Sequence, residues 1–181
     1  RLQEPIWRSV LSSAGLDQET SEELVKRFKS AYVRWEENSF PGLLGNVIAG
    51  RVANRLNLGG TNCVVDAACG SSLAAMKMAI SELREGRCDV MLTGGVDTDN
   101  SPFMYMCFSK TPAFTKRDQV QPFDKNSEGI MIGEGLGLVV LKRLEDAVRD
   151  GDRIYAKMMG VGSSSGGRVT GIDALREERQ A

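Results

Sequence analysis

Four cysteines are the candidate nucleophiles of this sequence, which contains no histidine. They are Cys63, Cys69, Cys88 and Cys107, separated by 6, 19 and 19 residues. This spacing includes no Cys-x-x-Cys pair, so it favours no zinc or other metal site, and the cysteines are too few for a disulfide-bonded scaffold. Because histidine is the commonest general base and metal ligand, its absence leaves thiolates, carboxylates and backbone amides as the chemical groups.

Cys69 differs from the other cysteines because it lies between a predicted strand and a predicted helix. The short, β-branched run Asn62–Ala68 predicts a strand buried on both faces, and apolar residues at spacings of 3, 4 and 3 predict a helix over Leu73–Leu83. Free amides and the dipole at a helix start stabilise a thiolate or an oxyanion, and Gly70 permits a sharp turn. The alternative is that Cys69 is a small buried apolar residue, which is the expected state of the other three cysteines.

The remaining patterns predict an α/β protein. Helices are expected within residues 1–38 and over Leu43–Leu56, and an irregular segment is expected over Ser101–Thr115. Further strands are expected at Asp89–Leu92, Leu138–Leu141 and Ile154–Val161, with a short helix ending near Asp150. Strands that alternate with helices indicate βαβ units and a mixed, mainly parallel sheet flanked by helices.

Two glycine clusters and one basic cluster favour no ligand of their own. Gly133-x-Gly135-x-Gly137 precedes a predicted strand, whereas a dinucleotide fingerprint follows one. The run Gly162–Gly167 lacks the Lys-Ser/Thr of a phosphate-binding loop. The charged stretch Lys142–Arg153 is interpreted as a solvated helix face; the alternative is that Lys142, Arg143 and Arg149 contact an acidic carrier protein.

Composition sets broad limits on the function. The chain has 181 residues, 41% of them hydrophobic and 26% charged, with a formal net charge of −1, so it shows no basic patch for nucleic acid. Its longest apolar run, within Gly135–Leu141, is too short for a membrane span. The first residues, Arg1–Val10, carry no initiating methionine or signal-peptide pattern, so we expect an excerpt of a longer polypeptide. Free cysteines favour a reducing compartment, and hence the cytoplasm.

The segment Asp66-Ala67-Ala68-Cys69-Gly70-Ser71-Ser72 resembles the nucleophile motif of β-ketoacyl synthases, usually Asp-Thr-Ala-Cys-Ser-Ser-Ser. Other matching segments follow in the family's order: Gly45–Arg51, Gly94-Gly95, Pro122-Phe123-Asp124, Glu128-Gly129, Gly133–Gly137, Leu141–Leu144 and Asp150–Asp152. The resemblance extends from about residue 40 onward. Phe108–Thr115 is most similar to the synthases of polyunsaturated fatty acid megasynthases.

The resemblance implies a thiolase-like fold, a homodimer formed through the strand Asn62–Ala67, and a mechanism. Cys69 would accept an acyl group from the phosphopantetheine arm of an acyl carrier protein, and malonyl-carrier would then lose CO2 and attack the thioester. Phe108 would line the acyl pocket, although ordinary core packing would equally explain it. No directly bound cofactor is implied, and the partners would be carrier proteins and other megasynthase domains.

The sequence departs from the family in one major respect. The resemblance implies two histidines and a lysine, which the family carries in two later segments, and neither of these segments is present here. Residues 1–181 are therefore interpreted as the N-terminal, nucleophile-bearing part of a ketosynthase domain. By itself this part is expected to be inactive in condensation. Ala67 and Gly70 replace the usual Thr and Ser. The alternative function is a non-catalytic dimerisation or carrier-docking module. A cysteine hydrolase would need a histidine base, and a thiolase fits Asp66–Ser72 less well.

Overall fold

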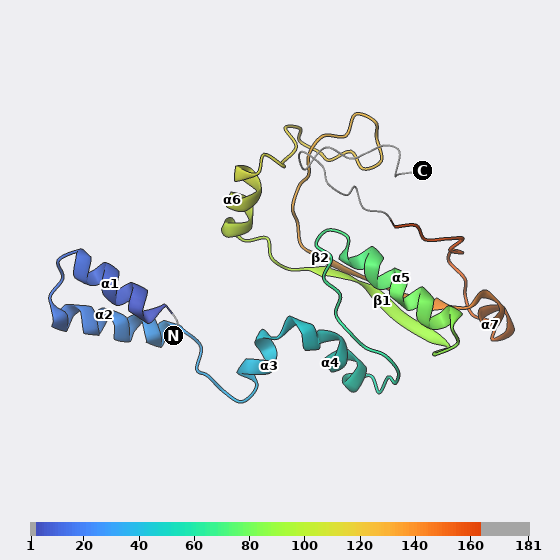
Figure 1. Cartoon of the computed structure of the whole chain (residues 1–181), viewed down its shortest axis with the longest axis horizontal. Coiled ribbons are helices and arrows are strands. Elements are labelled where there is room, and N and C mark those ends of the chain that lie inside the picture. Colours follow the sequence, from blue (N-terminus) through green and yellow to red (C-terminus); the bar gives the residue numbers. More distant parts are fainter. Residues whose placement is uncertain (1–2, 164–181) are drawn as a thin grey trace. The chain divides into compact units, whose positions relative to one another are not determined.

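The computed structural model describes residues 3–163, and the chain divides into two compact units, Arg1–Ile48 and Ala49–Ala181 (Figure 1). The first unit contains α1 (Glu4–Ser13), α2 (Gln18–Ala31), α3 (Ser39–Leu43) and the short 3-10 helix η1 (Gly45–Val47). The second contains α4 (Ile48–Arg55, which begins at the boundary), α5 (Ser71–Arg84), β1 (Val90–Asp97), α6 (Pro102–Lys110), β2 (Gly135–Lys142) and α7 (Leu144–Arg149). Among the helices of residues 3–163, none has the length and apolar character needed to cross a membrane.

The first unit is a helical hairpin closed by aromatic contacts. Asp17 caps α2 by accepting a hydrogen bond from the backbone N–H of Thr20 at 2.9 Å. Val25 is buried between the helices, and the ring of Trp7 lies 5.5 Å from Phe28 and 6.0 Å from Tyr32, measured between centroids. The predicted helix Leu43–Leu56 is not continuous. Leu43 ends α3, Leu44 is extended with φ −94° and ψ 95°, and the chain continues through η1 into α4.

In the second unit, α5 packs on one face of a two-stranded antiparallel sheet. The register runs from Val90 opposite Lys142 to Asp97 opposite Gly135. Figure 1 shows α5 lying along the β1–β2 ribbon, and the half-buried Met91, the buried Thr93 and Gly95 alternate on the side of β1 that α5 covers. The apolar residues of the opposite side are exposed: Val90, Leu92 and Val96 of β1, and Leu136, Leu138 and Val140 of β2.

Parts of the predicted sheet are absent from the described residues. The two strands that pair do so in antiparallel fashion, whereas the order of elements predicted parallel pairing. The predictions of strands over Asn62–Ala68 and Ile154–Val161 are wrong for this structure, in which neither segment forms one. A β-branched run becomes a strand only when a neighbouring strand accepts and donates its backbone hydrogen bonds, and residues 3–163 place no such neighbour beside either segment.

Candidate active site

Cys69 lies in a tight turn that joins residues 62–68 to α5. The backbone N–H groups of Gly70 and Ser71 donate to the carbonyl oxygens of Ala67 and Ala68, at 3.0 and 3.1 Å. The side chain of Ser71 also holds the turn: its Oγ accepts from the N–H of Ala67 at 2.9 Å and donates to the carbonyl of Ala68 at 2.6 Å. These four hydrogen bonds place the thiol immediately before the first turn of α5.

The residue before the thiol has an unusual backbone conformation. Ala68 has φ +49°, in the left-handed region that alanine rarely adopts, and its N–H donates to Asp66 Oδ1 at 3.0 Å. A strained residue next to a nucleophile persists only where the surrounding contacts hold it. Here the Asp66 and Ser71 side chains, one on each side of Ala68, supply those contacts.

The structure modifies the expected role of the helix-start amides. The N–H groups of Gly70 and Ser71 are already used within the turn, so they are not free to stabilise an anion on the Cys69 sulfur or an oxyanion beside it. The thiol itself is exposed and stands one residue before Gly70, the N-cap of α5. An exposed thiol is accessible to an electrophile in solvent, and the role of Cys69 as the nucleophile stays a prediction.

The first turn of α5 rests directly on β1. A Cβ atom built at Gly95 would lie 2.8 Å from the Cβ of Ser72, a distance that real Cβ atoms essentially never show. Ser72 is three residues after Cys69, so the strand and the nucleophile turn are in contact through a glycine. The family resemblance includes Gly94-Gly95, but the sequence alone indicated no role for this pair.

Phe108 belongs to an aromatic cluster at α6. Its ring centroid lies 6.0 Å from that of Phe114, which is 5.6 Å from Tyr105, and Phe108 is half-buried. The role of Phe108 in an acyl pocket stays a prediction. The segment around Phe108 is also helical, where an irregular one was expected; Ser101 caps α6 and Pro102 occupies its first turn.

The loop after this cluster returns to it through backbone hydrogen bonds. The N–H of Ile130 donates to the carbonyl of Ala113 at 2.9 Å, and the N–H of Thr115 donates to the carbonyl of Ile130 at 3.0 Å. Gly129 has φ +64°, and a Cβ there would lie 2.3 Å from the nitrogen of Thr115. Only glycine therefore fits this closure.

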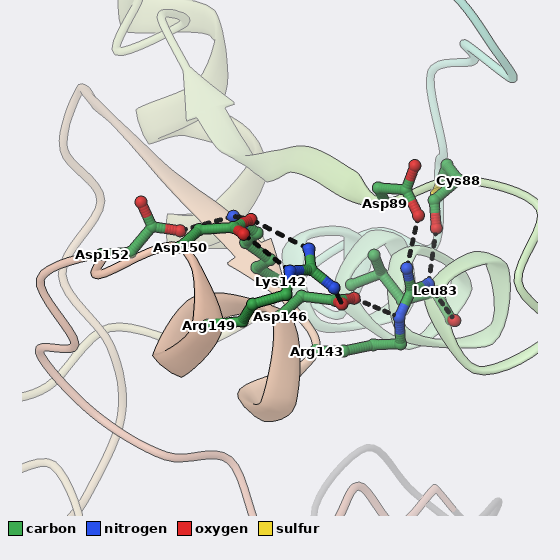
Figure 2. A network of polar contacts seen from close by, with 9 residues as sticks. All are labelled: Leu83, Cys88, Asp89, Lys142, Arg143, Asp146, Arg149, Asp150 and Asp152. Atoms are coloured by element: carbon green, nitrogen blue, oxygen red, sulfur yellow. Dashed lines mark hydrogen bonds and ion pairs between the residues drawn. The ribbon is translucent and has the colours of Figure 1, made fainter.

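Arg143 fastens the far end of α5 to the strand that follows it, as Figure 2 shows. Its Nη1 donates to the carbonyls of Leu83, in the last turn of α5, at 3.0 Å and of Cys88, just before β1, at 2.8 Å. Its guanidinium also pairs with Asp89 and, at 2.6 Å, with Asp146. The hydrogen bonds that Arg143 donates to Asp89 and then to Asp146 raise its pKa, so it remains a cation in this setting.

The other basic residues of this region are also committed to partners within the chain. Lys142 Nζ lies 2.5 Å from Asp150 and 2.6 Å from Asp152, and Arg149 pairs with Asp146 and Asp150 (Figure 2). Burial acts to raise the pKa of Asp146, but hydrogen bonds from Arg143 and Arg149 outweigh it and leave that pKa lowered. The cluster thus consists of intramolecular ion pairs.

The other cysteines lack the setting of Cys69. Cys88 is half-buried, and burial raises the pKa of its thiol, which disfavours the thiolate. Cys63 and Cys107 are exposed but do not stand at the start of a helix. Residues 3–163 contain no group of three or more histidine, cysteine and acidic side chains arranged to hold a metal ion.

Comparison with known proteins gives a consistent result. The model of the β-ketoacyl synthase N-terminal domain matches residues 7–147. A polyunsaturated fatty acid synthase of a Thraustochytrium species has a subunit that is 51% identical over 172 residues, which are 95% of this chain and 6% of that protein. The ketosynthase from module 6 of the bacillaene synthase of Bacillus subtilis has a TM-score of 0.62 and 37% identity, over 70% of this chain and 22% of that one.

A second solved structure is the complex of a type II polyketide synthase acyl-carrier protein with its ketosynthase bound to the hexaketide. It has a TM-score of 0.52 and 27% identity, over 59% of this chain and 28% of that one. The chain thus spans less than a tenth of the Thraustochytrium protein and less than a third of each ketosynthase chain. These structures also confirm the predicted thiolase-like α/β class, of which the described residues form part. With the family model matching most of its length, the chain belongs to the β-ketoacyl synthase family.

Proposed function

We propose that Cys69 is the acyl-accepting thiol of a β-ketoacyl-acyl-carrier-protein synthase of polyunsaturated fatty acid or polyketide synthesis. The observation that carries this proposal is the exposed thiol held at the start of α5 by the four hydrogen bonds of its turn. The similarity to the Thraustochytrium polyunsaturated fatty acid synthase supports the choice of pathway. We place the protein in the cytoplasm, where thiols stay reduced.

In the proposed reaction, the Cys69 thiolate attacks the thioester carbonyl of an acyl group carried on a phosphopantetheine arm. The tetrahedral intermediate collapses, the carrier's thiolate leaves and takes up a proton, and the acyl group remains on Cys69 as a thioester. Malonyl-carrier then loses CO2, and its carbanion attacks that thioester. The new carbon–carbon bond forms, the bond to the Cys69 sulfur breaks, and a β-ketoacyl-carrier is released.

The chain supplies only part of what this reaction needs. Removal of one oxyanion donor from an enzyme typically costs about 2.7–4 kcal/mol of transition-state stabilisation. The histidines and the lysine that the family resemblance implies for the decarboxylation are not in residues 1–181. We therefore expect acyl transfer to Cys69, but no condensation, from this chain by itself.

Three further assignments belong to the same proposal. Phe108 lines the acyl chain's pocket, and its aromatic cluster with Phe114 and Tyr105 would supply apolar contacts. A second copy pairs through Asn62–Ala67, a segment whose strand-like sequence has no partner strand among the described residues. An acyl carrier protein is the partner that delivers the substrate, and the solved complex of an acyl-carrier protein with its ketosynthase supports this choice of partner.

Acyl transfer tests the proposal directly. The full chain is incubated with an acyl-pantetheine thioester, and the adduct is located by mass spectrometry of peptides. We expect acylation at Cys69, none in Cys69→Ala, and unchanged acylation in the matched control Cys107→Ala, which removes another exposed thiol. Iodoacetamide or cerulenin should likewise modify Cys69 before Cys63 and Cys107. Equal labelling of all three exposed thiols, or acylation at none, would contradict an acyl-accepting role and leave the non-catalytic docking module.

A further inference from the structure

The contact between β1 and α5 passes through a position that has no room for a side chain. A Cβ at Gly95 would lie 2.8 Å from Ser72 Cβ, and 3.7 Å from both Ser72 Cα and Ser72 Oγ. Carbon atoms in ordinary contact stand about 3.5–4.0 Å apart. A methyl group at residue 95 would therefore have to displace the first turn of α5 by roughly 1 Å.

The rest of α5 is held in place, so the displacement would fall on its first turn. Ala79 and Leu83 are buried in the second half of the helix, and Arg143 bonds the carbonyl of Leu83 at its end. The first turn, by contrast, carries the half-buried Ser71, whose hydroxyl bonds the two residues before Cys69. A tilt of this end moves the turn that contains the thiol.

We propose that Gly95 is a positioning residue for Cys69: the absence of a side chain at 95 lets the first turn of α5 rest on β1, and this contact sets the position of the nucleophile. The inference rests on the proposed function, in which Cys69 must meet a thioester carbonyl. A misplacement of about 1 Å can reduce the rate of an enzymatic reaction by roughly a hundredfold. We expect Gly95→Ala to slow acylation of Cys69 by about ten- to a hundredfold.

The structure provides a compensating substitution. Ser72→Gly removes the one atom that lies closer than van der Waals contact, and the nearest remaining atom, the Cα of residue 72, lies 3.7 Å from the new methyl group. The double variant Gly95→Ala/Ser72→Gly should regain most of the acylation rate relative to Gly95→Ala. A loss caused by anything other than this contact would not be restored.

A matched control lies directly across the sheet. Gly137 is paired with Gly95 in the register, so both face the same side of the ribbon, yet a Cβ at 137 would meet nothing within 4 Å. Gly137→Ala introduces the same methyl group into the same sheet without the contact. Its acylation rate should equal that of the parent chain.

The experiment compares the parent, the three variants above and Ser72→Gly as full chains. The rate of Cys69 acylation by an acyl-pantetheine thioester and the rate of Cys69 alkylation by iodoacetamide at several pH values are both measured, with Cys63 and Cys107 as references in the same chain. Circular dichroism reports the helix content. The expected result is a slow Gly95→Ala, a restored double variant and a normal Gly137→Ala.

Each other outcome has a defined meaning. Acylation of Gly95→Ala at the parent's rate, or a slow variant that Ser72→Gly does not restore, overturns the inference. If Gly95→Ala does not fold, the double variant decides: recovery of helix content and acylation supports the contact, and failure to recover overturns it. If the parent chain is not acylated at all, the proposed function fails, while the ratio of Cys69 to Cys63 alkylation in each variant still tests the positioning role.

Discussion

Replacement of Ser71 by alanine should loosen the turn that holds Cys69. The Ser71 hydroxyl accepts a hydrogen bond from Ala67 and donates one to Ala68, so the substitution removes both and changes nothing else at the Cβ position. It also removes a constraint on Ala68, whose left-handed conformation costs roughly 1–2 kcal/mol relative to the right-handed one. The expected effect is a shift of the turn toward conformations in which Ala68 is relaxed.

The size of the effect follows from these contacts. Each hydrogen bond contributes about 1 kcal/mol net, and because Ser71 is half-buried, water replaces part of what is lost. A loss of about 1–2 kcal/mol lowers the ratio of native to alternative turn conformations by roughly 5- to 30-fold. The rate of Cys69 acylation by an acyl-pantetheine thioester follows the native fraction, so it should fall by up to this factor, while the rates of Cys63 and Cys107 alkylation should not change.

Two further variants make the result specific. Ser72→Ala removes the neighbouring hydroxyl, which makes no hydrogen bond among residues 3–163, and should react like the parent. Ala68→Gly removes the conformational penalty at φ +49°, so Ser71→Ala/Ala68→Gly should recover part of the loss. Ser71→Ala acylated as fast as Ser72→Ala would refute the reasoning, because it would show that the turn holds its shape without the serine.

Two other substitutions test features away from the thiol. Gly129→Ala should open the loop 116–128, because an alanine at φ +64° with its Cβ 2.3 Å from Thr115 N costs about 2–4 kcal/mol. Trypsin should then cut at Lys116, Arg117 and Lys125 several-fold faster than in the parent chain. Equal rates of cutting in Gly129→Ala and in the control Gly133→Ala, whose Cβ would meet nothing within 4 Å, would contradict this. Hydrogen bonds from Arg149 and then Lys142 lower the pKa of Asp150 from 3.8 to about 2. This lowered pKa adds stability that is present above pH 3.8 and is lost as the pH falls toward about 2. The melting temperature of Asp150→Asn should therefore fall less steeply than that of the parent over this pH range. The control Asp118→Asn changes a side chain without an ion pair in the described residues, and its melting temperature should fall as steeply as that of the parent.

The helix α5 could be predicted from the sequence because its signal is local. Apolar residues recur at helical spacing from Leu73 to Leu83, and Gly86 ends the pattern. The position of Cys69 just before this helix followed from the same pattern. The segment of α6 was predicted to be irregular because its aromatic and methionine residues show no helical spacing, although Ser101-Pro102 is a recognisable start signal for a helix.

Features that depend on distant neighbours could not be predicted in this way. The segment Asn62–Ala68 has the composition of a strand, but strand formation requires a partner, and composition does not say whether one is near. The direction of the β1–β2 pair is likewise set by how residues 98–134 return the chain to β1. The functions of Ser71 and Gly95 arise from distances of a few ångströms within a turn and between α5 and β1, for which the sequence carries no signal.

The order of elements in the second unit has a consequence for how the protein folds. Only residues 85–89 separate α5 from β1, whereas residues 98–134 separate β1 from β2. The entropic cost of closing a loop as long as the second is about 3 kcal/mol by the ideal-chain relation, and contacts close in sequence form faster than distant ones. We therefore expect α5 to dock on β1 before β2 arrives, so that amides of α5 become protected first in pulsed hydrogen exchange. The nucleophile turn would then be assembled on a single strand, early in folding, with the second strand added to a site that already exists.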